Sequence, residues 1–396
     1  MLKIIQQMKA QTNFDVIVLG VGSMGSATCY HLTKRGINIL GLEQFDIPHE
    51  HGSHWGQSRI IRKAYFEHSD YVPLLQRAYK NWKHLEKISG RQVYFQTGLL
   101  YFGLPEHQLI QGVQESARKY NIKIKELSER EMKSTYPRLK IPDTYKKLLE
   151  PEAGFLIPER AIHLYVEQAK KNGAVIKTKV KVLDWEKQNN GILVKTADAV
   201  YSAKKLIITA GAWASKLIPD LSGQLRITKQ TLAWIRPNKP SLFKPGNFPC
   251  WLLAEENKRG AYYGFPVVPA NEFNKSMGLK LAYHFAGATT DPDNMNRKPS
   301  KKNEASLIHF LNTYFPGTYK STIELKSCMY TNSSDENFII DFLPGYNNDV
   351  LFATGFSGHG FKFASVVGEI MSDLATEGKT RLPINFLRLN RFKKNS

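Results

Sequence analysis

The stretch FDVIVLGVGSMGSATCYHLTKRGINILGLE, residues 14–43, decides the fold of this chain. An apolar run leads into Gly20, Gly22 and Gly25, a helical stretch follows, and a second apolar run ends on Glu43. That order predicts a strand, a tight glycine turn, a helix and a second strand. The glycines let the backbone approach a pyrophosphate, the helix N-terminus offers unpaired N–H groups, and Glu43 can accept hydrogen bonds from ribose hydroxyls. The stretch therefore predicts a dinucleotide site, with FAD and NAD both open.

Length and composition predict a two-domain globular protein. The chain has 396 residues, 42% of them hydrophobic and 11% aromatic, which is ample for burial. No apolar run reaches the roughly 20 residues that a membrane helix requires. Residues 1–13 lack the apolar core and cleavage site of a secretory signal, so they are interpreted as an extension before the first strand. We expect a cytoplasmic protein without a membrane partner.

The cysteines and the charge limit the other partners. Cys29, Cys250 and Cys328 are widely spaced and odd in number, which favours a reducing compartment and predicts neither a disulfide framework nor a metal site. The net charge of +20 invites a nucleic-acid interpretation. However, the basic residues are scattered in pairs, with no basic helix or nucleic-acid motif. We expect no nucleic-acid partner, but a positive field that draws small anions toward a basic cleft.

Two later segments repeat the pattern of a buried strand followed by glycine. The run LIITAGAWA leads into Ala210 and Gly211, which predicts a second close approach of backbone to the cofactor. Near the C-terminus, Gly355, Gly358 and Gly360 open a helical stretch, so a second helix N-terminus can face an electron-rich group. A nicotinamide site is usually completed within one continuous half of a chain. Three separated segments therefore favour FAD.

The remaining pattern separates two kinds of structure. Helices are predicted around 71–89 and over 158–173, where proline opens and glycine closes the stretch. The segment 93–104, interrupted by Gly98, predicts a hairpin or adjacent strands of one sheet. From 226 to 325, prolines, aromatics and strand-like runs predict a mostly antiparallel sheet that faces the substrate.

Five motifs in one order make the chain resemble the family of monomeric sarcosine oxidase and N-methyl-L-tryptophan oxidase. The resemblance extends from Phe14 to about Phe392. The motifs are GSHWGQSRIIRKAY at 52–65, YYGFP at 262–266, GLKLAYH at 278–284, SCMYTNSSDENFIID at 327–341 and GFSGHGFKFAS at 355–365.

The resemblance implies a mixed α/β fold, with a glutathione-reductase-like Rossmann FAD domain and an inserted antiparallel-sheet substrate domain. We expect the FAD domain to be discontinuous, over 1–86, 156–225 and 326–396. The substrate and catalytic domain would then take 87–155 and 226–325. The family also implies a monomer.

The implied activity is the oxidation of a secondary amine, most simply an N-methyl amino acid, with O₂ as acceptor. The imine product hydrolyses to formaldehyde and the parent amino acid, and O₂ leaves as H₂O₂. The resemblance implies covalent FAD on Cys328, which is chemically sensible because a thiolate is a soft nucleophile. Cys29 and Cys250 are interpreted as structural cysteines.

The resemblance also implies roles for charged and polar side chains. Lys280 is expected to stabilise the anion that forms as O₂ is reduced. Arg62 and Lys362 are expected to hold the substrate carboxylate. Arg59 is expected beside the flavin ring, and further pocket side chains are Tyr263, His284, Met329 and Tyr330. The cofactor contacts expected from the motifs and the glycine turns are Gly20, Gly22, Ser23, Met24, Gly25, Glu43, Ser53, Arg59, Ala210, Gly211, Cys328, Gly355, Gly358, His359, Gly360, Phe361 and Lys362.

Two departures from the family pattern bear on specificity. Trp55 stands where the family usually has a second histidine, and the segment 267–277 is longer than in sarcosine oxidase. The preferred amine is therefore open among sarcosine, N-methyltryptophan, a cyclic imino acid and a glycated amine. Two alternatives stay open as well: a flavin dehydrogenase that uses another electron acceptor, and a basic nucleotide- or nucleic-acid-binding protein without catalysis.

Overall fold

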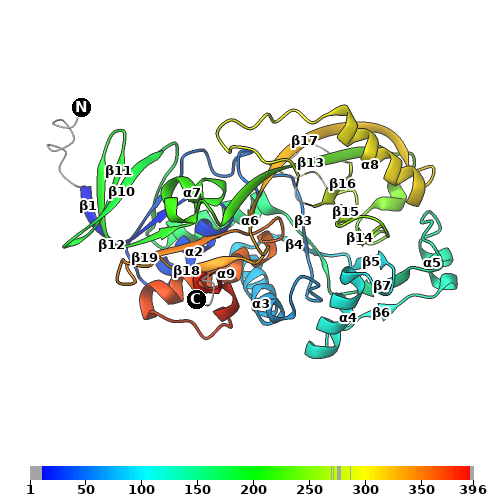
Figure 1. Ribbon diagram of the computed structural model, residues 1–396, viewed down its shortest axis with the longest axis horizontal. Coiled ribbons are helices and arrows are strands. Elements are labelled where there is room, and N and C mark those ends of the chain that lie inside the picture. The colour runs from blue at the N-terminus through cyan, green and yellow to red at the C-terminus, as the bar shows by residue number, and fades with distance from the viewer. Residues whose placement is uncertain (1–10, 269, 271, 274–277, 286, 393–396) are drawn as a thin grey trace.

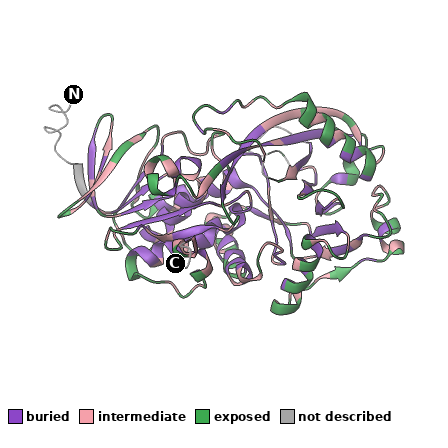
Figure 2. Cartoon of the chain, viewed as in Figure 1, coloured by how far each residue is buried: buried purple, intermediate pink, exposed green. Residues whose placement is uncertain are grey.

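Two eight-stranded sheets lie side by side in the computed structural model (Figure 1). The structure describes residues 11–268, 270, 272, 273, 278–285 and 287–392. Part of the longer segment 267–277 therefore lies outside the described residues. The central strands of both sheets are buried, whereas helices such as α4 (Gln108–Tyr120) and α8 (Lys301–Tyr314) expose one face (Figure 2).

The first sheet contains the predicted dinucleotide strands. Its main path runs β10-β11-β12-β1-β2-β9, and β19 joins β12 and pairs with β18. Strand β1 is parallel to β2 and β12, and β12 is parallel to β19. The carboxyl ends of these four strands therefore gather at one edge, where open parallel sheets bind ligands. The strands are β1 (Gln11–Leu19), β2 (Ile39–Leu42), β9 (Val175–Lys177), β10 (Val182–Gln188), β11 (Gly191–Thr196), β12 (Val200–Ile208), β18 (Ile339–Phe342) and β19 (Val350–Thr354).

A helical layer packs tightly on this sheet because two glycines leave room for backbone. Its helices are α2 (Ser23–Thr33), α3 (Val72–Ser89), α6 (Pro158–Lys171) and α9 (Ala364–Glu377). A Cβ on Gly25 would lie 1.9 Å from the Gly20 carbonyl oxygen. A Cβ on Gly368 of α9 would lie 2.5 Å from the Ala27 carbonyl carbon of α2. These positions bring α2 against the end of β1 and against α9.

The second sheet is mostly antiparallel, as predicted for 226–325. Its order is β17-β13-β16-β15-β14-β5-β7-β6, and only the β14–β5 pair is parallel among its described pairs. Figure 1 shows α8 lying along this sheet. The strands are β5 (Leu99–Gly103), β6 (Lys125–Glu126), β7 (Lys146–Glu150), β13 (Leu225–Pro237), β14 (Cys250–Leu253), β15 (Ala261–Phe265), β16 (Leu279–His284) and β17 (Tyr319–Ser333).

The remaining described elements are a small third sheet, two short α-helices and several 3₁₀ helices of three or four residues. The third sheet has the order β3-β8-β4, with β3 at Arg59–Ile61, β8 at Gly154–Leu156 and β4 at Tyr94–Gln96. Both of its pairs are antiparallel. The short helices are α5 (Glu129–Thr135) and α7 (Ala214–Leu217).

The prediction of a hairpin or adjacent strands over 93–104 is wrong. Strand β4 pairs with β8 in the third sheet, whereas β5 lies between β14 and β7 in the second. Gly98 separates the two strands with φ +77°, in the left-handed region that favours glycine. The helices predicted over 71–89 and 158–173 are confirmed as α3 and α6. The domain division stays a prediction, and one of its boundaries, at 325/326, lies inside β17.

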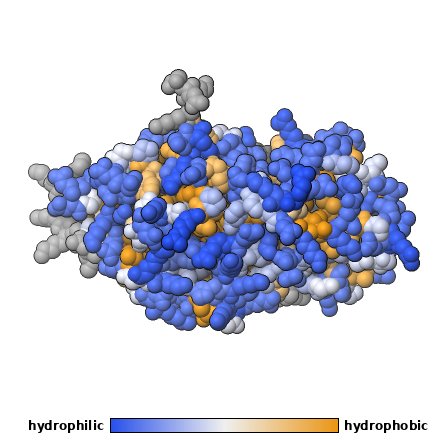
Figure 3. Space-filling model, turned by 90° about the horizontal axis from the view of Figure 1, so that it is seen from below, coloured by the Kyte–Doolittle hydropathy of each residue, from blue (hydrophilic) through white to orange (hydrophobic). Residues whose placement is uncertain are grey.

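The surface fits the composition. The face of the molecule in Figure 3 is covered mainly by hydrophilic side chains, with smaller hydrophobic areas between them. Within the described ranges, no helix is long and apolar enough to cross a membrane.

The close approach at Gly25 yields a stability prediction. In Gly25→Ala, the new methyl group meets the Gly20 carbonyl and also the Thr209 hydroxyl, 2.7 Å away, and backbone cannot move aside cheaply. We expect the free energy of unfolding to fall by about 2 kcal/mol, as for other overpacked sites. Urea unfolding measures this change.

Gly223→Ala is the matched control. Nothing lies within 4 Å of a Cβ at Gly223, and its φ is outside the left-handed region. Its free energy of unfolding should stay within about 0.5 kcal/mol of the wild type. Equal stability of the two variants would contradict the packing argument.

Candidate active site

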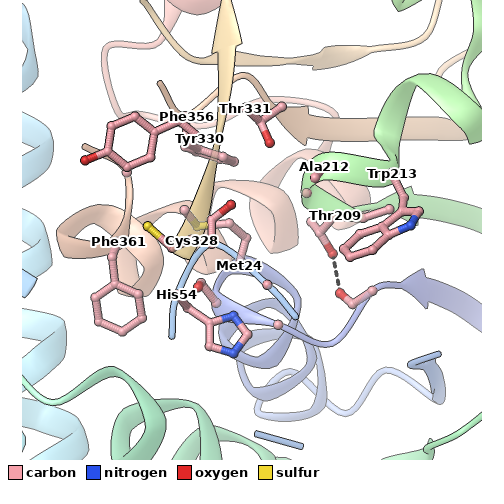
Figure 4. A pocket seen from close by; sticks show the side chains of 18 of the residues that line it. Met24, His54, Thr209, Ala212, Trp213, Cys328, Tyr330, Thr331, Phe356 and Phe361 are labelled. Atoms are coloured by element: carbon pink, nitrogen blue, oxygen red, sulfur yellow. Dashed lines mark hydrogen bonds between the residues drawn. The ribbon is translucent and has the colours of Figure 1, made fainter. Parts of the chain in front are cut away.

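Most of the predicted site residues line one cavity of about 490 Å³, with walls from both large sheets (Figure 4). The predicted residues in its lining are Gly20, Gly22, Ser23, Met24, Glu43, Ser53, Arg59, Arg62, Ala210, Gly211, Tyr263, His284, Cys328, Tyr330, Gly358, His359, Gly360, Phe361 and Lys362. Of the predicted residues that the structure describes, Gly25, Lys280, Met329 and Gly355 do not line it. Gly25 and Gly355 instead shape the turns that end β1 and β19.

The N-terminus of α2 faces the cavity with unpaired backbone donors. Gly22 is the N-cap residue, no side chain caps the helix, and its first turn contains no acidic residue. Gly20 turns the chain with φ +85°, and Gly22 itself lines the cavity. Unpaired N–H groups at a bare helix N-terminus favour a phosphate group. This end of the cavity therefore fits the pyrophosphate of a dinucleotide such as FAD.

Glu43 fixes the same turn from the end of β2. Its Oε2 accepts a hydrogen bond from Val21 N at 2.9 Å, and its Oε1 accepts one from Phe45 N at 3.1 Å. Burial raises the pKa of Glu43 to about 7. Each carboxylate oxygen can accept more than one hydrogen bond, so Glu43 can hold the turn and still accept from a ligand hydroxyl.

The segment after β12 forms the neighbouring wall. Thr209 Oγ1 donates to the Gly20 carbonyl at 2.7 Å, which ties this segment to the glycine turn. Ala210 and Gly211 follow in the cavity lining, and Figure 4 shows the Trp213 side chain on the same side. Thr209 and Trp213 were not among the predicted contacts. Their position directly around Ala210 and Gly211 was the signal that could have identified them.

Strand β17 brings Cys328 and Tyr330 into the cavity. Cys328 is only 2% exposed, and burial raises the pKa of its thiol. Met329 lies between them, but its side chain is buried in a cluster with Ala212 and Trp213. Successive side chains of a strand point to opposite faces. Met329 is not in the cavity lining, so the expectation that it lines the cavity is wrong. Alternation alone could not have corrected it, because Thr331 shares the strand face of Met329 and lines the cavity.

Arg59 and Lys280 both donate to the backbone of one loop. Arg59 Nη2 donates to Trp55 O at 2.5 Å, and Arg59 Nη1 donates to Ser58 O at 2.8 Å. Lys280 is fully buried, and its Nζ donates to Gly56 O at 2.5 Å and to Ser58 O at 2.8 Å. Burial holds the pKa of Lys280 well below its usual value. Lys280 thus lies behind the loop, whereas Arg59 lines the cavity.

Arg62 and Lys362 line the cavity in different states of pairing. Arg62 Nη2 donates to both carboxylate oxygens of Glu67, at 2.6 and 2.7 Å. Lys362 Nζ donates to His359 O at 2.7 Å and makes no ion pair within 4.0 Å with a described residue. Burial, with the charge of Arg62, lowers the pKa of Lys362 to about 7. Glu67 was not among the predicted site residues, although a buried arginine requires a carboxylate partner nearby.

Two other polar side chains of this part of the cavity, His284 and Tyr263, are neutral. His284 Nδ1 lies 3.2 Å from the Tyr330 hydroxyl, and burial lowers the pKa of His284 to about 4. Burial raises the pKa of Tyr263 to about 12. Phe66, Leu252 and other apolar side chains complete this end of the cavity. The arrangement can hold an anionic group by Arg62 and Lys362 next to a neutral, largely apolar space.

Within the described part of the chain, no group of three or more His, Cys, Asp or Glu residues could hold a metal ion.

Trp55 borders a separate cavity, where Lys326 Nζ lies 4.1 Å from the centre of its ring. The Trp55 indole is also buried in one cluster with Cys328 and Tyr330, two of the predicted residues that line the main cavity.

Comparisons with known proteins agree with this geometry. Residues 15–374 match the family model of FAD dependent oxidoreductases. Monomeric sarcosine oxidase from Bacillus sp. (strain NS-129) is 39% identical over 386 residues, which cover 96% of this chain and 97% of that protein. N-methyl-L-tryptophan oxidase from Citrobacter koseri is 35% identical over 382 residues, with 96% and 99% covered.

Solved structures share the fold at lower identity. NikD, an unusual amino acid oxidase essential for nikkomycin biosynthesis, superimposes with a TM-score of 0.82 at 21% identity, covering 96% of this chain and 98% of NikD. L-proline dehydrogenase from P. horikoshii gives a TM-score of 0.80 at 23% identity, with 96% and 98% covered. The glycine turn, the cavity and the sequence similarity agree, and this chain belongs to the family of FAD-dependent oxidoreductases.

Proposed function

We propose that this protein oxidises the secondary amine of an N-methyl amino acid, such as sarcosine or N-methyl-L-tryptophan, with O₂ as the electron acceptor. Two electrons and a proton leave the N-methyl carbon, and a second proton leaves the amine nitrogen. The resulting imine takes up water and gives formaldehyde and the amino acid. O₂ takes up two electrons and two protons and leaves as H₂O₂. One observation carries the proposal: Arg62 and Lys362, whose charged groups both lie over the Tyr65 ring, line the same cavity as Cys328.

FAD, when bound, supplies the two-electron chemistry that the side chains lack. Its pyrophosphate is proposed to lie at the N-terminus of α2, near Gly20 and Gly22, and its ribose at Glu43. Cys328 is proposed to hold the ring by a thioether, which is supported by the place of this cysteine in the cavity lining. The three free cysteines and the monomeric relatives support a monomer in a reducing, cytoplasmic setting.

The substrate carboxylate is proposed to bind Lys362 first and Arg62 second. Glu67 already neutralises Arg62 through two hydrogen bonds, whereas Lys362 donates to a backbone carbonyl and forms no ion pair with a residue that the structure describes. Burial disfavours the charged form of Lys362. A substrate carboxylate that binds this lysine offsets that cost through a charge-assisted hydrogen bond. Its competition with Glu67 for the Arg62 guanidinium then fixes the orientation of the substrate.

The neutral side chains suit an uncharged amine. His284, whose pKa burial lowers to about 4, and Tyr263 carry no charge near pH 7. A cationic amine gains little there, so deprotonation of the bound amine is favoured. Lys280 is proposed to stabilise the negative charge that develops as O₂ is reduced, a role supported by its fixed position behind Arg59.

A peroxide-coupled amine panel tests the function. We expect sarcosine or N-methyl-L-tryptophan to give one H₂O₂ and one formaldehyde for each O₂ consumed, because both products follow from one oxidised N-methyl group. Glycine and L-tryptophan, which lack that group, are the controls. Reduction of an artificial dye without peroxide would support a dehydrogenase instead.

The binding of a simple carboxylate should depend on the protonation of Lys362. Because burial lowers the pKa of Lys362 to about 7, this lysine is charged below pH 7 and loses its charge above it. We expect the dissociation constant of acetate, read from the flavin spectrum, to rise up to tenfold per pH unit above 7. Lys362→Met should bind acetate weakly at every pH.

Lys216→Met is the control for this measurement. Lys216 also lines the cavity, but it is already paired with Asp291 at 3.0 Å. Its removal should leave the acetate profile unchanged. A wild-type dissociation constant that is flat from pH 6 to 9 would count against a role of Lys362 in carboxylate binding.

Acid precipitation tests the proposed thioether. Yellow colour should stay in the wild-type pellet, and mass spectrometry should find the mass of FAD on the peptide that contains Cys328. In Cys328→Ser the colour should move to the supernatant. Cys250→Ser, which removes a buried cysteine outside the cavity lining, should keep the colour in the pellet. Wild-type colour in the supernatant would rule out the bond.

A further inference from the structure

The loop at residues 56–58 carries backbone strain between the buried Lys280 and the half-buried Arg59. Gly56 has φ +125° and Gln57 has φ +68°, which puts a residue other than glycine in the left-handed region. Such a conformation costs on the order of 1 kcal/mol and persists only where the surroundings hold it. Arg59 and Lys280 both donate to carbonyl groups of this loop. The backbone N–H groups of the loop then require an acceptor on the side opposite Arg59 and Lys280.

Glu159 provides that support from the first turn of α6. Its Oε1 accepts hydrogen bonds from Gly56 N at 2.9 Å and from Gln57 N at 3.0 Å. The residue is only 2% exposed, and its Oε2 is buried without a hydrogen-bond partner among the described residues. A buried carboxylate with a free oxygen is costly. The arrangement therefore calls for a compensating interaction.

The compensating charges lie on the far side of the loop. The Gly56 peptide points its N–H to Glu159 and its carbonyl to Lys280 Nζ, 2.5 Å away. Neither Lys280 nor Arg59 forms an ion pair within 4.0 Å with any residue that the structure describes. Attraction to Glu159 raises the pKa of Lys280, against the larger opposite effect of burial and the repulsion by Arg59. Glu159 is thus the anion that acts on this pair of cations through one strained loop.

We propose that Glu159 is a positioning residue of the oxidase reaction. It holds the loop in the conformation that places Arg59 and Lys280, and its negative charge offsets theirs beside the cavity. The inference rests on the proposed function, in which these two cations act on the flavin and on O₂. Glu159 touches neither substrate nor the proposed flavin position, since it does not line the cavity.

Glu159→Gln separates charge from geometry, because the amide oxygen can still accept from Gly56 N and Gln57 N. The holoenzyme is reduced with dithionite and mixed with O₂ over pH 6 to 10. Loss of the anion should make Lys280 give up its proton more readily. We expect the pH at which reoxidation slows to fall by about one unit. We also expect the reduction potential of the bound flavin to rise, because the net charge nearby becomes more positive.

Two further variants separate this role from plain stability. Glu159→Asp keeps the charge, so it should retain the wild-type potential and pH profile even if urea unfolds it more easily. Glu150→Gln is the matched control: Glu150 is fully buried and accepts from Lys63 N at 2.6 Å in the neighbouring loop. It should lower stability and leave the flavin potential unchanged.

The results distinguish this inference from the proposed function. Wild-type potential and pH profile in Glu159→Gln would overturn it, whatever happens to stability. If Glu159→Gln does not fold, a shifted potential or profile in Glu159→Asp would overturn it equally. Chemical reduction needs no amine, so these readouts stand even if no substrate in the amine panel is oxidised. Failure of the panel would overturn the proposed function alone.

Discussion

The contact between the Gly20 carbonyl and Gly25 is the constraint on which the rest of this structure depends. With no room for a Cβ between them, the first turn of α2 lies directly against the end of β1. The helix N-terminus is thereby fixed at the edge where β1, β2, β12 and β19 end. Unpaired N–H groups, the Glu43 carboxylate and the Thr209 hydroxyl then meet at one end of the cavity. The absence of a side chain at Gly25 thus determines where the end of the cavity that is proposed to hold the cofactor pyrophosphate lies.

At the other end, the cations are fixed in three different ways. Arg62 is paired with a carboxylate, Lys362 with a single carbonyl, and Lys280 with two carbonyls of a strained loop. These partners determine the pKa of each buried group and how readily it can bind another anion. The chemistry of the three residues therefore depends on their partners as well as on their type, a guanidinium in Arg62 and an ammonium in the two lysines.

The parts of the site that local sequence determines could be predicted. Gly20, Gly22 and Glu43 follow from one strand–turn–helix–strand pattern, and the cavity lining contains all three. The place of Lys280 behind the loop could not be predicted, because its partners Gly56 and Ser58 lie more than 200 positions away in the chain. Glu159 was missed for a similar reason, since the loop that it supports lies 103 positions away at Gly56. Glu67 lies only five positions from Arg62, so this pairing could have been predicted. The strands around Gly98 fail similarly: local pattern gives two strands but not the sheets that they join.

The path of β17 gives the proposed thioether a mechanical meaning. This strand belongs to the second sheet through its long pairing with β13, and it carries Cys328 in the middle of that pairing, opposite Gln230. The end of the cavity that is proposed to hold the nucleotide belongs to the first sheet. A cofactor that is bound at one end to the first sheet and covalently attached at the other end to β17 would link the two sheets. Pulling the two sheets apart would then require release of the nucleotide as well as rupture of the protein contacts, so the cofactor would be a structural tie as well as a reagent.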